Sequence, residues 1–237
     1  MKVGVIVAMD KEFDVIAQAW RSETPLSRNE SKVDGCRMIR LCPSEDNEVA
    51  LVRSGIGKVN AAMATLLLAN DGVDCIVSSG VAGGALASLQ PGQTVIGLQY
   101  HYHDVYCGKE VAKGQVQGET EFFCADDKLI KIASSLQIDD CIAGAIVSGD
   151  QFVDTKREMG RILDEYPFTI AVDMESCAIA QVCYKRNIPF ISFRMLSDAI
   201  LNPEARSYED FWSKAPLQMA SSTTRYVMKV LQEYKPF

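Results

Sequence analysis

The sequence predicts an α/β protein with a mixed, mostly parallel central sheet. Short apolar runs alternate with helix-like segments along the chain, and a hairpin-like pair of runs lies within 37–53. The alternation is typical of parallel strands linked by helices, and the hairpin adds an antiparallel part. Because the 237 residues contain no linker, repeat or low-complexity stretch, we expect one domain, 1–237.

The chain begins with a buried strand, a helix and a hairpin. The run 3–8 is apolar enough for a parallel strand. Asp10 can cap the following helix, in which four apolar residues share one face. These residues are Phe13, Ile16, Ala17 and Trp20. The polar stretch 21–34 is expected to be a loop or a weak edge strand. The runs 37–42 and 48–53 are expected to be strands around a turn.

The rest of the chain alternates between helices and strands. Gly57 opens a helix that carries Val59, Met63, Leu66 and Leu67 on one face. The further strands are expected at 75–79, 94–100, 141–147, 168–172 and 189–196. The further helices are expected at 126–136, 155–165 and 174–186, followed by a long final helix with Val227, Val230, Leu231 and Tyr234 on one face.

Composition excludes several classes of protein. Apolar residues make up 48% of the chain and charged residues 23%, so a sizeable core is expected. The net charge of −7 disfavours a nucleic-acid partner. No apolar run reaches the length of a membrane span, and no signal peptide is visible. The eight cysteines form no Cys-x-x-Cys pair, which favours free thiols and a cytoplasmic location.

Acidic residues follow several of the predicted strands. Glu12 comes after the first strand, Asp173 and Glu175 after 168–172, and Asp198 after 189–196. In an open α/β sheet, ligands bind at the carboxyl ends of the strands. The sequence therefore predicts a site built from these carboxyl groups.

Five short strings surround these acids: Val7–Glu12, Ser54–Lys58, Ser148–Phe152, Val172–Glu175 and Arg194–Asp198. Together they resemble bacterial 5′-methylthioadenosine/S-adenosylhomocysteine nucleosidase, of the purine nucleoside phosphorylase/nucleosidase superfamily, over nearly the whole chain. The resemblance implies a three-layer α/β/α sandwich of the nucleoside phosphorylase type. It also implies hydrolysis of the N-ribosidic bond with release of adenine, without a metal or an organic cofactor. The implied substrates are 5′-methylthioadenosine and S-adenosylhomocysteine, with 5′-deoxyadenosine as a further candidate.

The resemblance gives each acid a role. Asp198 would protonate the leaving base, Glu12 would activate water, and Glu175 would bind the ribose hydroxyls. Each acid also has a structural alternative: Asp198 as a helix N-cap, Glu12 as a surface residue favoured by the helix dipole, and Glu175 as a capping acid at a strand end.

The resemblance also implies a set of substrate-binding residues, with Asp173 expected at the rim. These are Ile56, Val81, Ala82, Gly83, Phe152, Val153, Asp173, Met174, Arg194, Ser197 and Tyr208. Val81 departs from the serine that the family often has, so Glu12 and Arg194 would hold the attacking water without a hydroxyl there. For Phe152 and Tyr208 the alternative is core packing.

The sequence is less consistent with other functions. A purine nucleoside phosphorylase needs cations for phosphate, whereas the first strand–helix turn presents Asp10 and Glu12. A non-catalytic nucleoside-binding protein is disfavoured because all three acids remain. A dinucleotide-binding loop is disfavoured because 55–60 lacks the third glycine. His101 and His103 could share a metal, but a structural or interface role is favoured. The resemblance implies a homodimer, with residues 100–125 reaching the neighbouring subunit's site.

Overall fold

The computed structural model describes residues 1–23, 30–138, 140–205 and 207–235. The strands in this part of the chain are β1 (Lys2–Val7), β2 (Ser31–Val33), β3 (Cys36–Ser44), β4 (Asn47–Arg53), β5 (Cys75–Ser78), β6 (Val81–Gly84), β7 (Thr94–Tyr102), β8 (Phe123–Cys124), β9 (Cys141–Ser148), β10 (Thr169–Asp173) and β11 (Phe190–Asp198). The helices are α1 (Asp10–Glu23), α2 (Lys58–Asn70), α3 (Asp127–Ser134), α4 (Lys156–Glu165), α5 (Ser176–Arg186), α6 (Tyr208–Lys214) and α7 (Pro216–Glu233).

The strands form one mixed sheet, in the order β2-β3-β4-β1-β5-β11-β6-β10-β9-β7-β8. β1 pairs in parallel with β4 and β5, and β11 pairs in parallel with β5 and β6. The hairpin β3–β4 is antiparallel, as the sequence predicts. β11 also pairs with β7, so β11, β6, β10, β9 and β7 close into a ring. The predicted fold class is confirmed.

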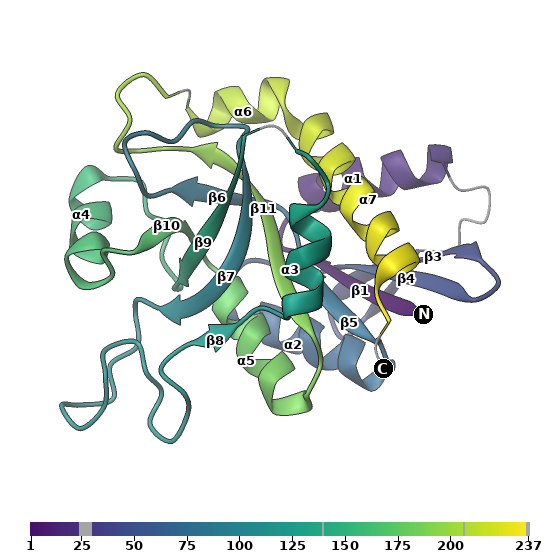
Figure 1. Cartoon of the computed structure of the whole chain (residues 1–237), viewed down its shortest axis with the longest axis horizontal. Helices are drawn as coiled ribbons and strands as arrows, with labels where there is room; N and C mark the ends of the chain where they lie inside the picture. The colour runs from purple at the N-terminus through teal and green to yellow at the C-terminus, as the bar shows by residue number, and fades with distance from the viewer. Residues whose placement is uncertain (24–29, 139, 206, 236–237) are drawn as a thin grey trace.

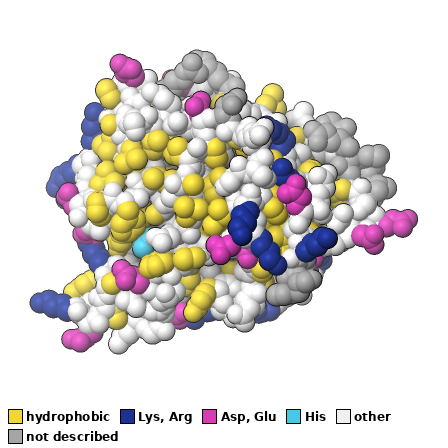
Figure 2. Space-filling model, viewed as in Figure 1, with side chains coloured by type: hydrophobic (Ala, Val, Ile, Leu, Met, Phe, Trp, Pro, Cys, Tyr) yellow, Lys and Arg dark blue, Asp and Glu magenta, His cyan; other side chains and the backbone are white. Residues whose placement is uncertain are grey.

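Helices cover both faces of the sheet (Figure 1). α3 and α7 lie on the near side, with α1 packed against α7, and α2 and α5 pack together on the other side. The indole nitrogen of Trp20 in α1 donates a hydrogen bond to the hydroxyl of Thr224 in α7 at 2.7 Å. Figure 2 shows hydrophobic side chains gathered over β6, β7 and β9, where Figure 1 draws no helix. None of the described helices combines the length and the apolar character of a membrane span.

Some local expectations need correction. The loop or weak edge strand expected at 21–34 is confirmed in part. β2 (Ser31–Val33) lies at the edge of the sheet, whereas α1 extends to Glu23, and 24–29 lies outside the described residues. Asp10 is the first residue of α1 and not the residue before it, and its carboxylate pairs with Arg37 at 2.6 Å and Arg53 at 3.3 Å.

Helix α2 packs against β1 and α5 mainly through small side chains. Ala61, Ala64, Thr65 and Leu68 are buried, whereas Val59 is 70% exposed and Met63 48% exposed. The apolar face expected from the sequence is therefore a surface face. Small side chains explain the choice of face, because they let α2 approach β1 and α5 closely.

Candidate active site

One cavity of about 120 Å³ collects every site residue that the sequence predicts. It lies where β1, β10 and β11 end, beside β6 and the start of α2. Its lining comprises Ala8, Met9, Glu12, Ile56, Val81, Ala82, Gly83, Gln151, Phe152, Val153, Val172, Asp173, Met174, Glu175, Arg194, Ser197, Asp198 and Tyr208. Four lining residues were not expected from the sequence, although all of them lie within the quoted strings: Ala8, Met9, Gln151 and Val172.

Glu12 lies in the first turn of α1, and its side chain is buried. Oε2 accepts hydrogen bonds from the backbone nitrogens of Ala8 at 3.0 Å and Met9 at 2.9 Å, and Oε1 accepts one from Val81 at 2.9 Å. Burial raises the pKa of Glu12, although Arg194 and these three N–H groups favour its anion. The surface alternative for Glu12 is therefore wrong.

Gly80 makes room for this carboxylate. A Cβ atom at position 80 would lie 2.4 Å from Oε1 of Glu12, and φ at this residue is +120°. Both the space and the backbone conformation require glycine here. The turn between β5 and β6 is thus shaped around the side chain of Glu12.

Arg194 on β11 is a buried cation held by several partners. Its Nε lies 3.0 Å from Oδ2 of Asp173, and its Nη2 lies 3.3 Å from Oε2 of Glu175. Nη2 also donates to Oγ of Ser78 at 3.0 Å, and Nη1 donates to the carbonyl of Val81 at 3.0 Å. Burial disfavours the charged guanidinium, but the nearby carboxylates outweigh it and raise the pKa of Arg194.

Asp173 does not lie at the rim, contrary to expectation. Its side chain is 1% exposed and accepts hydrogen bonds from the hydroxyls of Ser148, at 2.5 Å, and Ser176. It also accepts from the backbone nitrogens of Glu175 and Ser176 at the start of α5. The reason is that Asp173 ends a buried strand and caps the next helix while it pairs with Arg194.

Because Asp173 accepts the hydrogen bonds at the start of α5, the side chain of Glu175 does not cap this helix. It makes no side-chain cap to α5, and its Oε1 instead accepts a hydrogen bond from the backbone nitrogen of Gly57 at 2.9 Å. The alternative that Glu175 is a capping acid is therefore wrong, since Asp173 has that role. Burial raises the pKa of Glu175 to about 7, against the opposing effect of Arg194.

Asp198 is the last residue of β11, and its carboxylate accepts a hydrogen bond from the hydroxyl of Ser197 at 2.7 Å. No described helix starts after it until Tyr208, where Ser207 is the cap, so the N-cap alternative for Asp198 is wrong. Burial raises the pKa of Asp198, opposed by the Ser197 hydrogen bond. In the described chain no cation forms an ion pair with this carboxyl group, in contrast to Glu175, which pairs with Arg194.

Two aromatic rings border the cavity. Phe152 is 58% exposed, and its ring meets that of Tyr208 edge-on with centroids 5.9 Å apart. The hydroxyl of Tyr208 lies 3.5 Å from the sulfur of Met9. The exposure of Phe152 excludes core packing as its main role.

The two histidines belong to no larger cluster of candidate metal ligands in the described part of the chain. Among the described residues, no three His, Cys, Asp or Glu side chains are placed to hold a metal. His101 is buried and packs against Phe122 and Phe168, with centroids 5.2 and 4.9 Å away. This packing supports the structural reading of His101.

Comparison with known proteins identifies the superfamily of the chain. The family model of the phosphorylase superfamily matches residues 2–228. The Streptococcus pneumoniae MTA/SAH nucleosidase, solved with 8-aminoadenine, is 30% identical with a TM-score of 0.85, covering 96% of this chain and 99% of that one. The Neisseria meningitidis 5′-methylthioadenosine/S-adenosylhomocysteine nucleosidase is 29% identical with a TM-score of 0.84, covering 98% and 99%. The Helicobacter pylori futalosine hydrolase is 26% identical with a TM-score of 0.86, covering 97% and 98%.

The sequence, the fold and the solved relatives agree on one class of enzyme. The family model spans most of the chain, and the similar structures, matched over nearly their full length, are named as nucleosidases or as a futalosine hydrolase. The chain therefore belongs to the phosphorylase superfamily and is a nucleosidase.

Proposed function

We propose that this nucleosidase hydrolyses the N-ribosidic bond of 5′-methylthioadenosine and S-adenosylhomocysteine, and also of 5′-deoxyadenosine, and releases adenine. One observation carries the proposal: Glu12, Glu175 and Asp198 line a single cavity in three different environments. Glu12 is held by backbone N–H groups, Glu175 adjoins a buried arginine, and Asp198 has no cationic partner among the described residues. Carboxyl groups in unlike environments can divide acid, base and binding roles.

Asp198 is the general acid in this proposal. Cleavage leaves negative charge on the departing purine, which must be protonated. A carboxyl group with a raised pKa and no neighbouring cation holds its proton closer to neutral pH and can donate it. The hydroxyl of Ser197 fixes the carboxyl group through the 2.7 Å hydrogen bond.

Glu12 is the general base that takes a proton from the attacking water. Hydrogen bonds to both oxygens fix its carboxylate at the end of β1. Val81 supplies its backbone nitrogen to Glu12 and its carbonyl to Arg194, so the two groups that would hold water share one support.

Glu175 binds the ribose hydroxyls, with Met174 beside the sugar. Its carboxylate accepts hydrogen bonds that strengthen as positive charge grows on the ribose in the transition state. The remaining lining residues shape the binding space: Ile56, Ala82, Gly83, Phe152, Val153, Asp173 and Tyr208.

Water is favoured over phosphate as the acceptor. Arg194 is the one cation among the described lining residues, and it already pairs with Asp173 and Glu175. Arg53, at the end of β4, pairs with Asp10. A phosphate dianion requires unpaired cations or free N–H groups. Arg194 and Arg53 are both already paired with carboxylates.

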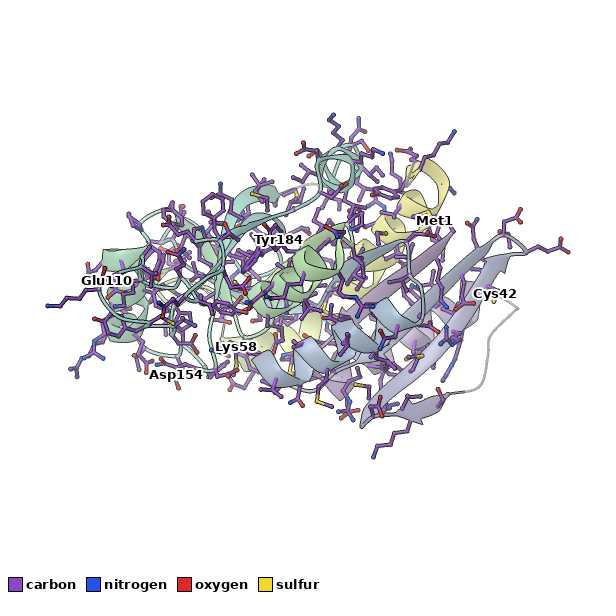
Figure 3. The ribbon with its side chains drawn as sticks, turned by 90° about the horizontal axis from the view of Figure 1, so that it is seen from below. Met1, Cys42, Lys58, Glu110, Asp154 and Tyr184 are labelled. Atoms are coloured by element: carbon purple, nitrogen blue, oxygen red, sulfur yellow. The ribbon has the colours of Figure 1, made fainter. Side chains whose placement is uncertain are left out.

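We also propose that the enzyme works as a homodimer through the exposed face of α2. Val59, Met63 and Leu66 lie on this face, with Ile56 before the helix and Tyr184 on the adjacent α5. Figure 3 shows α2 and α5 on the underside of the molecule. Large exposed apolar patches mark interaction sites. Since Ile56 also lines the cavity, a partner covering this face, with its residues 100–125, would border the site.

Gel filtration with light scattering tests the dimer. Val59→Lys places a charge on the exposed face without filling the core, and it should shift a dimer to a monomer. Lys32→Glu on the exposed edge strand β2 is the matched charge-changing control. A wild-type monomer, or a dimer that survives Val59→Lys, would contradict the proposal.

We also propose that the reaction takes place in the cytoplasm, where it would clear by-products of S-adenosylmethionine use. All eight cysteines are free thiols, as suits a reducing compartment.

The test of the activity is adenine release by the purified protein, with and without phosphate, and identification of the sugar product. 5′-Methylthioadenosine and S-adenosylhomocysteine should release adenine and a free reducing sugar without phosphate. A sugar 1-phosphate would indicate a phosphorylase instead. Because a futalosine hydrolase is among the similar structures, futalosine is the necessary comparison substrate, and a clear preference for it would overturn the proposed substrates.

A further inference from the structure

Helix α2 begins against the usual electrostatic rule. Its first residue is Lys58, its first turn contains no acid, and Gly57 before it provides no side-chain cap. A cation at a helix N-terminus is unfavourable, because the helix dipole is positive there. Departures from local rules of this kind concentrate at functional sites.

Two aspartates from other loops compensate for this departure. Nζ of Lys58 donates to both carboxylate oxygens of Asp104, at 2.8 and 2.7 Å. The backbone nitrogen of Lys58 donates to Oδ1 of Asp150 at 2.8 Å, and the backbone nitrogen of Asp150 donates to Oδ2 of Asp104 at 2.8 Å. We call Lys58, Asp104 and Asp150 the Lys58 clamp. Lys58 and Asp104 are each about three-quarters buried, with side chains 23% and 24% exposed.

The Lys58 clamp joins two segments of the cavity wall. Gly57, directly before Lys58, holds Glu175 through its backbone nitrogen, and Ile56 lines the cavity. Directly after Asp150, residues 151–153 line it as well. The spacing between the segments therefore depends on the hydrogen bonds of the clamp.

We propose that the Lys58 clamp is a positioning device for the nucleoside, with Lys58 as its central residue. The proposal rests on the proposed function, because it assigns the clamp to the same cavity. Without the Lys58 ammonium, Asp104 and Asp150 repel each other and the segments at 56–57 and 150–153 move apart. Glu12 and Asp198 are on α1 and β11, outside the clamp, and Glu175 keeps its contact with Arg194, so substrate binding weakens more than the chemical step.

Steady-state kinetics with 5′-methylthioadenosine tests this assignment. Lys58→Met should raise KM about tenfold, the effect of losing one charged hydrogen bond, and change kcat far less. Lys58→Arg keeps a two-pronged donor for Asp104 and should recover most of the loss. Asp104→Asn should give a similar rise, and combining it with Lys58→Met should add little. Lys229→Met, which removes an i,i+4 pair on α7, is the control and should leave KM unchanged.

A second measurement separates this proposal from the proposed function. Hydrogen exchange at the amides of Gly57, Lys58 and Asp150 should be faster in Lys58→Met than in wild type, whichever nucleoside the enzyme prefers. Unchanged exchange at these amides would overturn the clamp. An unchanged KM, or a fall in kcat with KM unaltered, would also overturn it. Wild-type protein without adenine release would contradict the proposed function alone, and the exchange data would still decide on the clamp.

Discussion

The backbone nitrogen of Val81 donates a hydrogen bond to Oε1 of Glu12 at 2.9 Å, across the cavity floor between β6 and α1. The family resemblance leads one to expect a serine hydroxyl at this position. The contact made here is independent of the side chain at position 81. The orientation of Glu12 is therefore fixed by strand geometry, and a valine is compatible with an ordered carboxylate.

Replacing Asp198 with asparagine should lower kcat about 10²- to 10⁴-fold, the range for loss of a general acid. The melting temperature should not fall, because burial disfavours the anion that the change removes. Adenine release gives kcat, and thermal unfolding gives the melting temperature. Asp154→Asn, an exposed residue near the cavity, is the control. A kcat near that of wild type would remove Asp198 from its role.

Glu12→Gln should bind substrate but hydrolyse it about 10²- to 10⁴-fold more slowly. The amide oxygen can replace one carboxylate oxygen, but the NH₂ group then faces a backbone N–H donor, Val81 or the pair Ala8 and Met9. This unsatisfied contact should cost about 1–3 kcal/mol of stability. Calorimetric titration with 5′-methylthioadenosine separates binding from turnover. If affinity and turnover fall equally, Glu12 has a structural role.

Gly80→Ala should inactivate the enzyme and destabilise it. The new Cβ would displace the carboxylate of Glu12, and the backbone would keep a positive φ that alanine resists. Gly160→Ala is the matched control, because that glycine lies in α4 with no atom within 4 Å of the added Cβ. The control should gain up to about 1 kcal/mol in urea unfolding. Similar behaviour of both variants would refute the packing argument.

The stability of the protein should fall as pH rises from about 4.5 to about 7, in part because of Glu175. Its folded pKa of about 7 exceeds its ordinary value of 4.5, so the folded state binds the proton more tightly than the unfolded state. The stabilisation is full below pH 4.5 and is lost as pH rises through 7. Urea unfolding at pH 5 and pH 8 should show a smaller loss in Glu175→Gln. An identical loss in wild type and variant would argue that the pKa of Glu175 is not raised.

Much of the candidate site could be predicted, because its residues occur in short strings at the ends of predicted strands. Met174 and Glu175, and likewise Ser197 and Asp198, come after apolar runs that clearly predict strands. The position of Asp173 could not be predicted, because its burial depends on Arg194 and Ser148, which lie elsewhere in the chain. Sequence spacing cannot report such partners.

The exposed face of α2 shows a second limit. Helical spacing correctly groups Val59 and Met63, but it does not say whether that face meets the core or solvent. The alanines on the opposite face decide the packing through their small size. α6 was missed for a different reason, since its seven residues are too few for a clear helical period.

The position of β11 has a consequence for how the chain folds. Although it is the last strand in sequence, it lies between β5 and β6, where it joins the two halves of the sheet. During synthesis, the edges of β5 and β6 that pair with β11 therefore remain unpaired until residues 190–198 leave the ribosome. Pairings across so many residues form slowly. We expect the nascent protein to remain open to aggregation until this strand inserts, and the catalytic cavity to form in one late step.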